Sequence, residues 1–314
     1  MEIAALIDAL ASPAAYPGLR PAAVEVLQTH ISAVFRLERD VFKVKKPVAL
    51  GFVDYSTLER RRRCCAAEVA LNRRLAAEVY LGVVPVTCRE GHVTMGGDGE
   101  VIDYAVHMRR LPDERTLEAA LARGEVDEAA MTALGRRLAE FHAGAAGGPE
   151  IAAYAAAAAV ERNCRQNFEQ LAALVAGAAP PVPGALVERV AAATEAELGR
   201  RRGLIDARAA GGAARACHGD LRLDHVYVFP ERAPPADLLV IDCIEFNDAF
   251  RYSDPIADLA FLVMDLRIHG YAGHAAALCA GYFAAAGDRA GEALLPLYVG
   301  YRATVRAKVE GMRA

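Results

Sequence analysis

The amino-acid sequence predicts an α+β fold with a small, β-rich first part and a larger, mainly helical second part. Residues 31–46 alternate in the manner of strands, and further strand-like runs follow as far as Pro112. Beyond Pro112, apolar residues mostly recur every three to four positions, which is typical of helices. The chain has 314 residues, 54% of them hydrophobic, which is enough for two ordinary domains or for one fold with two lobes.

The first part contains one predicted helix among its strands. This helix begins at Thr57 and ends before Gly82. The strands are expected at 31–35, 41–45, 83–87 and 101–108. We therefore expect an N-terminal lobe over residues 1–108, followed by a hinge over residues 109–112.

The second part, residues 113–314, is predicted to form a helical lobe. Helices are expected at 117–123, 128–146 and 151–175, then up to about Ala209, and again from Asp254 to the C-terminus. Three prolines within 178–184 interrupt the helical pattern. Short strands are expected at 216–217, 226–229 and 238–241, on either side of polar residues. A β-rich lobe, a hinge and a helical lobe together predict a cleft between the lobes.

Composition excludes several classes of function. A net charge of -4 argues against a protein that holds nucleic acid through its phosphates. No apolar run approaches the roughly 20 residues that a membrane span needs. The seven cysteines include no CxxC pair, which is typical of a reduced, cytoplasmic protein. We expect a cytoplasmic protein whose partners include neither nucleic acid nor a membrane.

Lysine is scarce and clustered. Only four of the 36 basic residues are lysines, and three of these, Lys43, Lys45 and Lys46, fall within four positions. In a chain that otherwise uses arginine, such a cluster indicates a site that needs a compact ammonium group on a flexible side chain.

The motif with the strongest chemical content is His218-Gly219-Asp220-Leu221-Arg222, followed by Val240-Ile241-Asp242. Asp220 and Asp242 are 22 residues apart, and a chain of that length can fold back as a hairpin. One carboxylate can then accept a proton from a hydroxyl while the other holds Mg²⁺ on a nucleotide. Arg222 adds a permanent cation that could steady a transferring phosphoryl group.

These motifs resemble those of the aminoglycoside phosphotransferase family, small-molecule kinases with a protein-kinase-like, bilobed fold. The resemblance covers most of the chain and implies that Asp220 is the catalytic-loop aspartate and that Asp242 binds the metal. His218 belongs to the same catalytic motif, and kinase-like folds use it to brace the loop. Asp254 and Asp258 match the start of a family helix, where a negative charge is favoured by the helix dipole.

The resemblance also assigns nucleotide contacts in the first lobe. The segment 41–45 is similar to the strand whose lysine contacts the α- and β-phosphates; the pattern selects Lys45, and Lys43 stays open as an alternative because it shares the same strand face. Glu68 matches the helix glutamate that pairs with this lysine. Met108 and Arg109 fall at the hinge, where backbone groups would meet the adenine.

Two departures from the family pattern concern the phosphates and the metal. The loop 29–32 has no glycine, so phosphate cover must rely on its backbone amides and on the Ser32 hydroxyl. The family's second metal ligand, an asparagine five residues after the catalytic aspartate, is His225 here. Either His225 ligates and favours Mn²⁺, or it stands aside and Asp224 or Glu245 supplies an oxygen for Mg²⁺.

Several segments, among them Lys45-Lys46-Pro47 and 51–58, are closer still to a phosphotransferase-like module often fused to a C-terminal P-loop kinase. No G-x-x-x-x-G-K-[ST] motif occurs in this chain, so it is a stand-alone homologue or a fragment. The resemblance implies an ATP-dependent transfer of the γ-phosphoryl group to a hydroxyl of a small molecule. Two alternatives stay open: a kinase-like binding module without turnover, and a hydrolase with a metal on His218, Asp220, His225 and Asp242.

Overall fold

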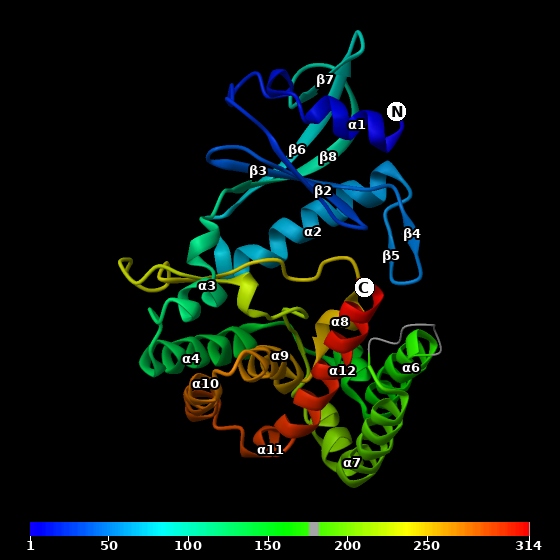
Figure 1. Cartoon of the computed structure of the whole chain (residues 1–314), viewed down its shortest axis with the longest axis vertical. Helices are drawn as coiled ribbons and strands as arrows, with labels where there is room; N and C mark the ends of the chain where they lie inside the picture. The colour runs from blue at the N-terminus through cyan, green and yellow to red at the C-terminus, as the bar shows by residue number, and fades with distance from the viewer. Residues whose placement is uncertain (176–181, 314) are drawn as a thin grey trace. The chain divides into compact units, whose positions relative to one another are not determined.

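The computed structural model describes residues 1–175 and 182–313, so that residues 178–181 of the predicted interruption lie outside the described part. The chain divides into two compact units (Figure 1). Unit 1 is Met1–Ala119 with Val226–Asn247, and unit 2 is Ala120–His225 with Asp248–Ala314. The α+β fold with a β-rich first unit and a helical second unit is as predicted. The finer division into an N-lobe, a hinge at 109–112 and a C-lobe stays a prediction.

Unit 1 is built on an antiparallel sheet with the strand order β1-β2-β3-β8-β6-β7. Its strands are β1 (Glu25–Gln28), β2 (Ser32–Arg36), β3 (Asp40–Lys45), β6 (Tyr80–Arg89), β7 (His92–Met95) and β8 (Glu100–Arg109). The four predicted strands are confirmed as β2, β3, β6 and β8. The short strands β1 and β7 were not predicted.

Two helices cover opposite faces of this sheet (Figure 1). Phe42 and Val44 of β3 belong to the apolar cluster that includes α1 (Ile3–Leu10). Val106 of β8 belongs to the cluster that includes α2 (Leu58–Ala76), the predicted helix, which Thr57 caps through its hydroxyl. Because side chains alternate along a strand, Lys43 and Lys45 lie on the α2 face.

Two hairpins complete unit 1, together with the 3₁₀ turns η1 (Pro13–Ala15) and η2 (Asp113–Arg115). The strands β4 (Ala49–Leu50) and β5 (Val53–Asp54) form one. The strands β10 (Val226–Val228) and β11 (Leu238–Val240) form the other, which confirms the predicted fold-back before Asp242. This second hairpin packs on the α2 cluster through Tyr227, Phe229 and Leu239.

Unit 2 is helical. Its helices are α4 (Glu128–Gly144), α5 (Pro149–Ala155), α6 (Ala157–Val175), α7 (Gly184–Ala210), α8 (Asp248–Arg251), α9 (Pro255–Ile268), α10 (Ala272–Ala286), α11 (Arg289–Glu292) and α12 (Leu295–Arg313), and α3 (Leu117–Ala122) precedes them. The strands β9 (Arg215–Ala216) and β12 (Tyr252–Ser253) pair, and η3 (Leu223–His225) ends the unit's first segment. The single helix predicted over 151–175 was wrong. It breaks at Ala156, whose backbone is extended, and the Asp206 carboxylate of α7 accepts the N–H of Ala157 at 2.9 Å to start α6.

Helix α9 runs through the interior of unit 2, and every residue from Pro255 to Leu266 is buried. Asp258 and Asp265 are seven residues apart and therefore lie on the same face of the helix. Beside it, α4 and α10 pack very closely. A Cβ atom at Gly281 would lie 2.1 Å from the Thr132 carbonyl oxygen, so this crossing requires glycine. In the part of the chain that the structure describes, no helix is long and apolar enough to cross a membrane.

Candidate active site

The predicted site residues fall into two groups, one in each compact unit. In unit 1, both strand lysines lie beside Glu68 of α2. Lys45 Nζ lies 2.7 Å from Glu68 Oε2, and Lys43 Nζ lies 3.0 Å from Glu68 Oε1. Each lysine also pairs with a residue that follows β11: Lys43 with Asp242 Oδ1 at 2.7 Å, and Lys45 with Glu245. Two lysines and three carboxylates form one charged cluster.

The two lysines differ in their access to solvent. Lys45 is completely buried, and its ammonium group also donates to the Tyr55 hydroxyl at 3.3 Å. Tyr55 in turn donates to Glu245 Oε1 at 2.6 Å, and the Glu245 side chain is only 5% exposed. The Lys43 side chain is 17% exposed and its partner Asp242 is 44% exposed. A ligand can therefore reach the Lys43–Asp242 end of the cluster and not Lys45.

The charges in this cluster stabilise one another. Burial lowers the pKa of Lys45 and of Lys43, but the facing carboxylates outweigh it and hold both pKa values well above the ordinary range. Burial raises the pKa of Glu68, and the two ammonium groups more than compensate, so that this pKa lies below its usual value. Both lysines and Glu68 are therefore charged at neutral pH.

The backbone around Asp242 is held by residues that sequence reasoning missed. Asp242 has a φ of +64°, in the left-handed region. Its N–H donates to the Tyr80 hydroxyl at 3.1 Å, and the N–H of Cys243 donates to Asn72 Oδ1 at 2.8 Å. Asn72 lies one helical turn after Glu68 and donates to its carbonyl oxygen at 2.9 Å. The position of Asn72 on the α2 stripe with Glu68 was the available signal.

Of the two residues of unit 1 that were predicted to bind Mg²⁺, Asp242 and Glu245, only Asp242 is suited to the ion. Asp242 offers a partly exposed carboxylate, the hard oxygen ligand that Mg²⁺ prefers. Glu245 was predicted as an oxygen ligand, but its carboxylate is buried against Lys45 and Tyr55. A metal role for Glu245 would require both contacts to break.

In unit 2, the loop that contains Asp220 is tied to helix α9. The N–H groups of His218 and Gly219 donate to the two oxygens of Asp258 at 2.9 and 2.8 Å, and Gly219 adopts a φ of +91°. Asp265 accepts the N–H of Leu223 at 3.0 Å. Burial raises the pKa of Asp258, and its hydrogen bonds and the neighbouring histidines bring it well below the usual range. The sequence placed Asp258 only at the helix start; its hold on the loop was missed.

Within this loop, Asp220 is partly exposed and His218 is buried. His218 Nδ1 accepts the N–H of Asp220 at 3.3 Å, so the ring supports the loop from inside. Arg222 pairs with Asp224, and its Nε lies 3.8 Å from Asp220 Oδ2. Burial lowers the pKa of Arg222, while Asp220 and Asp224 raise it above its ordinary value, so the guanidinium stays charged.

His225 is engaged inside the loop. Its Nδ1 lies 2.8 Å from the carbonyl oxygen of Asp220, and because a carbonyl only accepts, Nδ1 carries the proton. The other ring nitrogen, Nε2, lies 3.4 Å from the guanidinium of Arg222. A cation at that nitrogen opposes the approach of a metal ion. This geometry favours the second of the two predicted outcomes, in which His225 stands aside.

A compact group of potential metal ligands lies deeper in unit 2, at His142, Cys217 and Asp258, and it is the one such group found among residues 1–175 and 182–313. All three are buried. Burial raises the pKa of the Cys217 thiol well above its ordinary value, so it is a poor ligand. His142 bonds Asp258 at 3.0 Å and the Tyr282 hydroxyl at 2.9 Å. The group is a packed hydrogen-bond network. His142 lies on the apolar stripe of its helix, a position that predicts a core histidine with satisfied hydrogen bonds, and this is what the structure shows.

The predicted phosphate cover is not formed by the β1–β2 turn. Thr29 Oγ1 accepts the N–H groups of Ile31 and Ser32 at 3.3 and 3.0 Å, so these amides are already used. The Ser32 side chain is buried, and its hydroxyl has no hydrogen-bond partner among the described residues. The sequence expectation for Ser32 is therefore corrected: a threonine closes this turn where a glycine-rich loop would leave amides open.

The hinge amides are also largely engaged. Arg109 donates its N–H to the Val79 carbonyl and Arg110 donates to that of Arg39, both at 2.8 Å. Met108 lies inside β8, between β3 and β6. Met108 and Arg109 were predicted to offer backbone groups to the adenine. Within the described residues of the hinge, Leu111 is instead the one whose N–H donates to no acceptor.

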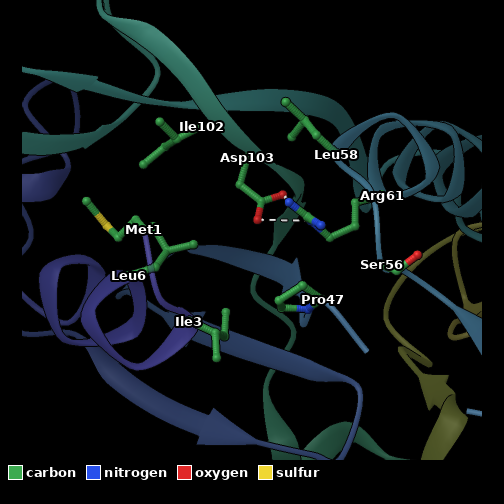
Figure 2. A pocket seen from close by; sticks show the side chains of 9 residues that line it. All are labelled: Met1, Ile3, Leu6, Pro47, Ser56, Leu58, Arg61, Ile102 and Asp103. Atoms are coloured by element: carbon green, nitrogen blue, oxygen red, sulfur yellow. Dashed lines mark hydrogen bonds and ion pairs between the residues drawn. The ribbon is translucent and has the colours of Figure 1, made fainter. Parts of the chain in front are cut away.

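Unit 1 also contains a cavity of about 200 Å³ between α1, the start of α2 and β8 (Figure 2). Met1, Ile3 and Leu6 form its apolar side. Arg61 and Asp103 line the opposite side and pair with each other, with Arg61 Nε 2.9 Å from Asp103 Oδ1. The sequence predicts that the basic run Arg60–Arg63 is a solvated face. Arg60, Arg62 and Arg63 are exposed, whereas Arg61 is buried by its pairing with Asp103 and departs from this prediction.

Comparisons with known proteins identify the family and the fold. The sequence model of the Phosphotransferase enzyme family (APH) matches residues 23–295. The uncharacterized proteins Rv2004c of Mycobacterium tuberculosis and Mb2027c of Mycobacterium bovis are each 35% identical over 290 residues, 92% of this chain and 55% of theirs. The chain thus spans about half the length of these relatives. A choline/ethanolamine kinase family protein from Mesorhizobium loti shares the fold, with a TM-score of 0.51 and 15% identity over 98% of this chain and 85% of that chain.

Proposed function

Because the chain belongs to the phosphotransferase enzyme family, we propose that it transfers the γ-phosphoryl group of ATP to a hydroxyl group of a small molecule. The observation that carries this proposal is the Lys43 ammonium group, which bridges Glu68 and Asp242 at 3.0 and 2.7 Å on an accessible side of unit 1. This arrangement joins a phosphate-binding cation to a metal-binding carboxylate.

We assign the α- and β-phosphate contact to Lys43 rather than to Lys45, which the sequence pattern had selected. Lys43 is partly exposed and Lys45 is enclosed by Glu68, Glu245 and Tyr55. Glu68 orients both ammonium groups through its two oxygens.

Asp242 is the residue that would hold Mg²⁺, with Mn²⁺ as a substitute, and the ion would supply charge neutralisation at the phosphates. In unit 2, Asp220 would accept the proton of the acceptor hydroxyl, since its carboxylate is partly exposed. Arg222 would stabilise the transferring group, because its guanidinium is permanently charged. His218 and His225 position the Asp220 backbone.

The acceptor is a small molecule with a hydroxyl group, and the family name does not identify it. Neither nucleic acid nor a membrane is a partner in this proposal, and we place the reaction in the cytoplasm. We also propose that longer relatives carry a P-loop kinase module fused to the part that corresponds to this chain.

The test is a screen of ATP consumption across sugars, amino sugars, amino alcohols and aminoglycosides, with Mg²⁺ and with Mn²⁺. Asp220→Asn serves as the control for contaminating activity. We expect acceptor-dependent ADP formation in the wild type that the variant loses. Binding of ATP without turnover by any acceptor favours the kinase-like binding module instead, because the engaged β1–β2 turn and His225 both depart from the family pattern. Absence of ATP binding by calorimetry refutes the proposal.

A further inference from the structure

The second lysine and the third carboxylate of the cluster have no role in the proposed reaction. Lys45 and Glu245 are both buried, and Glu245 follows Asp242 by three residues. Burying two charges is costly unless each is paired and hydrogen-bonded. Here each is: Lys45 contacts Glu68, Glu245 and Tyr55, and Tyr55 closes the arrangement by donating to Glu245.

The residue that needs positioning is Asp242. Aspartate enters the left-handed region more easily than most non-glycine residues, but the conformation still costs free energy, and contacts from the surroundings help to hold it. Tyr80 and Asn72 fix the N–H groups of Asp242 and Cys243. Those two hydrogen bonds hold the backbone on either side of the Asp242 Cα atom, at the N–H of Asp242 and at the N–H of Cys243. Beyond Cys243 the segment is attached again at Glu245, which contacts Lys45 and Tyr55, and at Asn247, whose Nδ2 donates to the Phe52 carbonyl oxygen at 3.0 Å. Of these two, Glu245 is the buried, charged attachment.

We propose that Lys45, Tyr55 and Glu245 form a buried anchor that fixes segment 242–245 against β3 and so positions the Asp242 carboxylate beside Lys43. The three are positioning residues. The anchor rests on the proposed function only for the role of Asp242 in binding Mg²⁺. The two attachment points, Lys43 for Asp242 and Lys45 for Glu245, are alternate residues of one strand. Because alternate residues of a strand share one face, the two lysines can hold two carboxylates of one segment.

Glu68 couples the anchor to the accessible end of the cluster. Its Oε2 contacts Lys45 and its Oε1 contacts Lys43, so the buried lysine also sets the orientation of the carboxylate that Lys43 shares. Loss of the anchor is therefore expected to disturb Asp242 directly and Lys43 through Glu68.

The test compares Glu245→Gln and Tyr55→Phe with Asp40→Asn. The last variant removes the carboxylate charge from another side-chain pair of unit 1, in which Asp40 Oδ1 lies 2.6 Å from His107 Nε2. Asp40 lies at the start of β3, at the end opposite Lys45, and serves as the control. The first measurement is hydrogen–deuterium exchange of the amides of Asp242 and Cys243 in the protein without nucleotide. We expect about tenfold faster exchange in Glu245→Gln, the size of one lost charged hydrogen bond, and a smaller acceleration in Tyr55→Phe.

The second measurement is the Mg²⁺ concentration that gives half-maximal turnover. We expect it to rise about tenfold in Glu245→Gln, with a smaller rise in KM for ATP, because the metal-binding carboxylate is displaced directly and Lys43 is disturbed only through Glu68. Unchanged exchange in Glu245→Gln, or equal acceleration in Asp40→Asn, overturns the anchor. If no acceptor supports turnover, the proposed function fails by itself, and the exchange experiment still decides the anchor. Tyr55→Phe keeps both charges and decides it if Glu245→Gln does not fold.

Discussion

Replacing Lys45 by methionine is expected to destabilise the protein far more than the same replacement of Lys43. Without Lys45, Glu245 loses its cation and Glu68 keeps only Lys43, although both carboxylates stay buried. Removing one partner of a buried ion pair costs about 3–5 kcal/mol. Without Lys43, the buried Glu68 keeps Lys45, and Asp242 is nearly half exposed, so water screens its loss and the cost is about 1 kcal/mol.

These free energies convert into a measurable difference in melting temperature. For a domain near the size of unit 1, each kcal/mol shifts Tm by about 2–4 °C. We expect Lys45→Met to lower Tm by about 6–20 °C and Lys43→Met by about 2–4 °C. Circular dichroism is the suitable probe, since the chain has no tryptophan. Lys308 is the lysine outside residues 43–46, and Lys308→Met controls for the effect on Tm of replacing any lysine by methionine.

Nucleotide affinity is expected to change in the opposite order. Calorimetry with ATP and Mg²⁺, well below every melting temperature, should show weaker binding in Lys43→Met by about 10–100-fold, the loss of a charged phosphate contact. Equal melting temperatures for the two variants would refute the assignment of Lys45 to the buried anchor. A larger loss of affinity in folded Lys45→Met would return the phosphate contact to Lys45.

Three further predictions concern the carboxylates and His225. Asp220→Asn is expected to keep ATP affinity and to lower turnover at least about 10²-fold, as loss of a general base does; steady-state turnover within a few fold of wild type would remove Asp220 from the mechanism. His225→Asn is expected to keep Mg²⁺-dependent turnover and Asp242→Asn to abolish it; loss of a Mn²⁺-dependent activity in His225→Asn would show that the histidine is a ligand. The pKa of Asp258 is lower in the folded protein than its ordinary value, so its stabilisation is present above about pH 4 and is lost as the pH falls below it. Urea unfolding at several pH values should therefore show the stability gap between wild type and Asp258→Asn narrowing below about pH 4, and a constant gap would contradict the assignment.

Periodicity and spacing predicted the elements of the fold well where one physical signal dominated. The alternation in β2 and β3 and the Thr57 cap of α2 are local signals, and all three elements were found. The break at Ala156 was missed because its cause is distant: the Asp206 carboxylate comes from α7, and nothing near Ala156 announces it. Arg61 was misplaced for the same reason, since its partner Asp103 lies 42 residues away in β8.

The candidate site shows the same limit. The meeting of Glu68 with a strand lysine was expected from the family resemblance, and both Lys43 and Lys45 lie beside it. The sequence could not predict which lysine is accessible. Accessibility depends on Glu245 and Tyr55, which cover Lys45 and come from two other segments. The threonine that uses the amides of the β1–β2 turn was likewise visible only in three dimensions.

The left-handed backbone at Asp242 has a consequence for sequence variation. Glycine, asparagine and aspartate adopt this conformation at the least cost, whereas β-branched residues are strongly disfavoured. A saturation library at position 242, selected for cellular abundance alone, should thus retain these three residues even where phosphoryl transfer has been eliminated elsewhere in the chain. Of the three, only aspartate carries a charge. Backbone geometry has narrowed the choice at this position before any demand of catalysis acts on it.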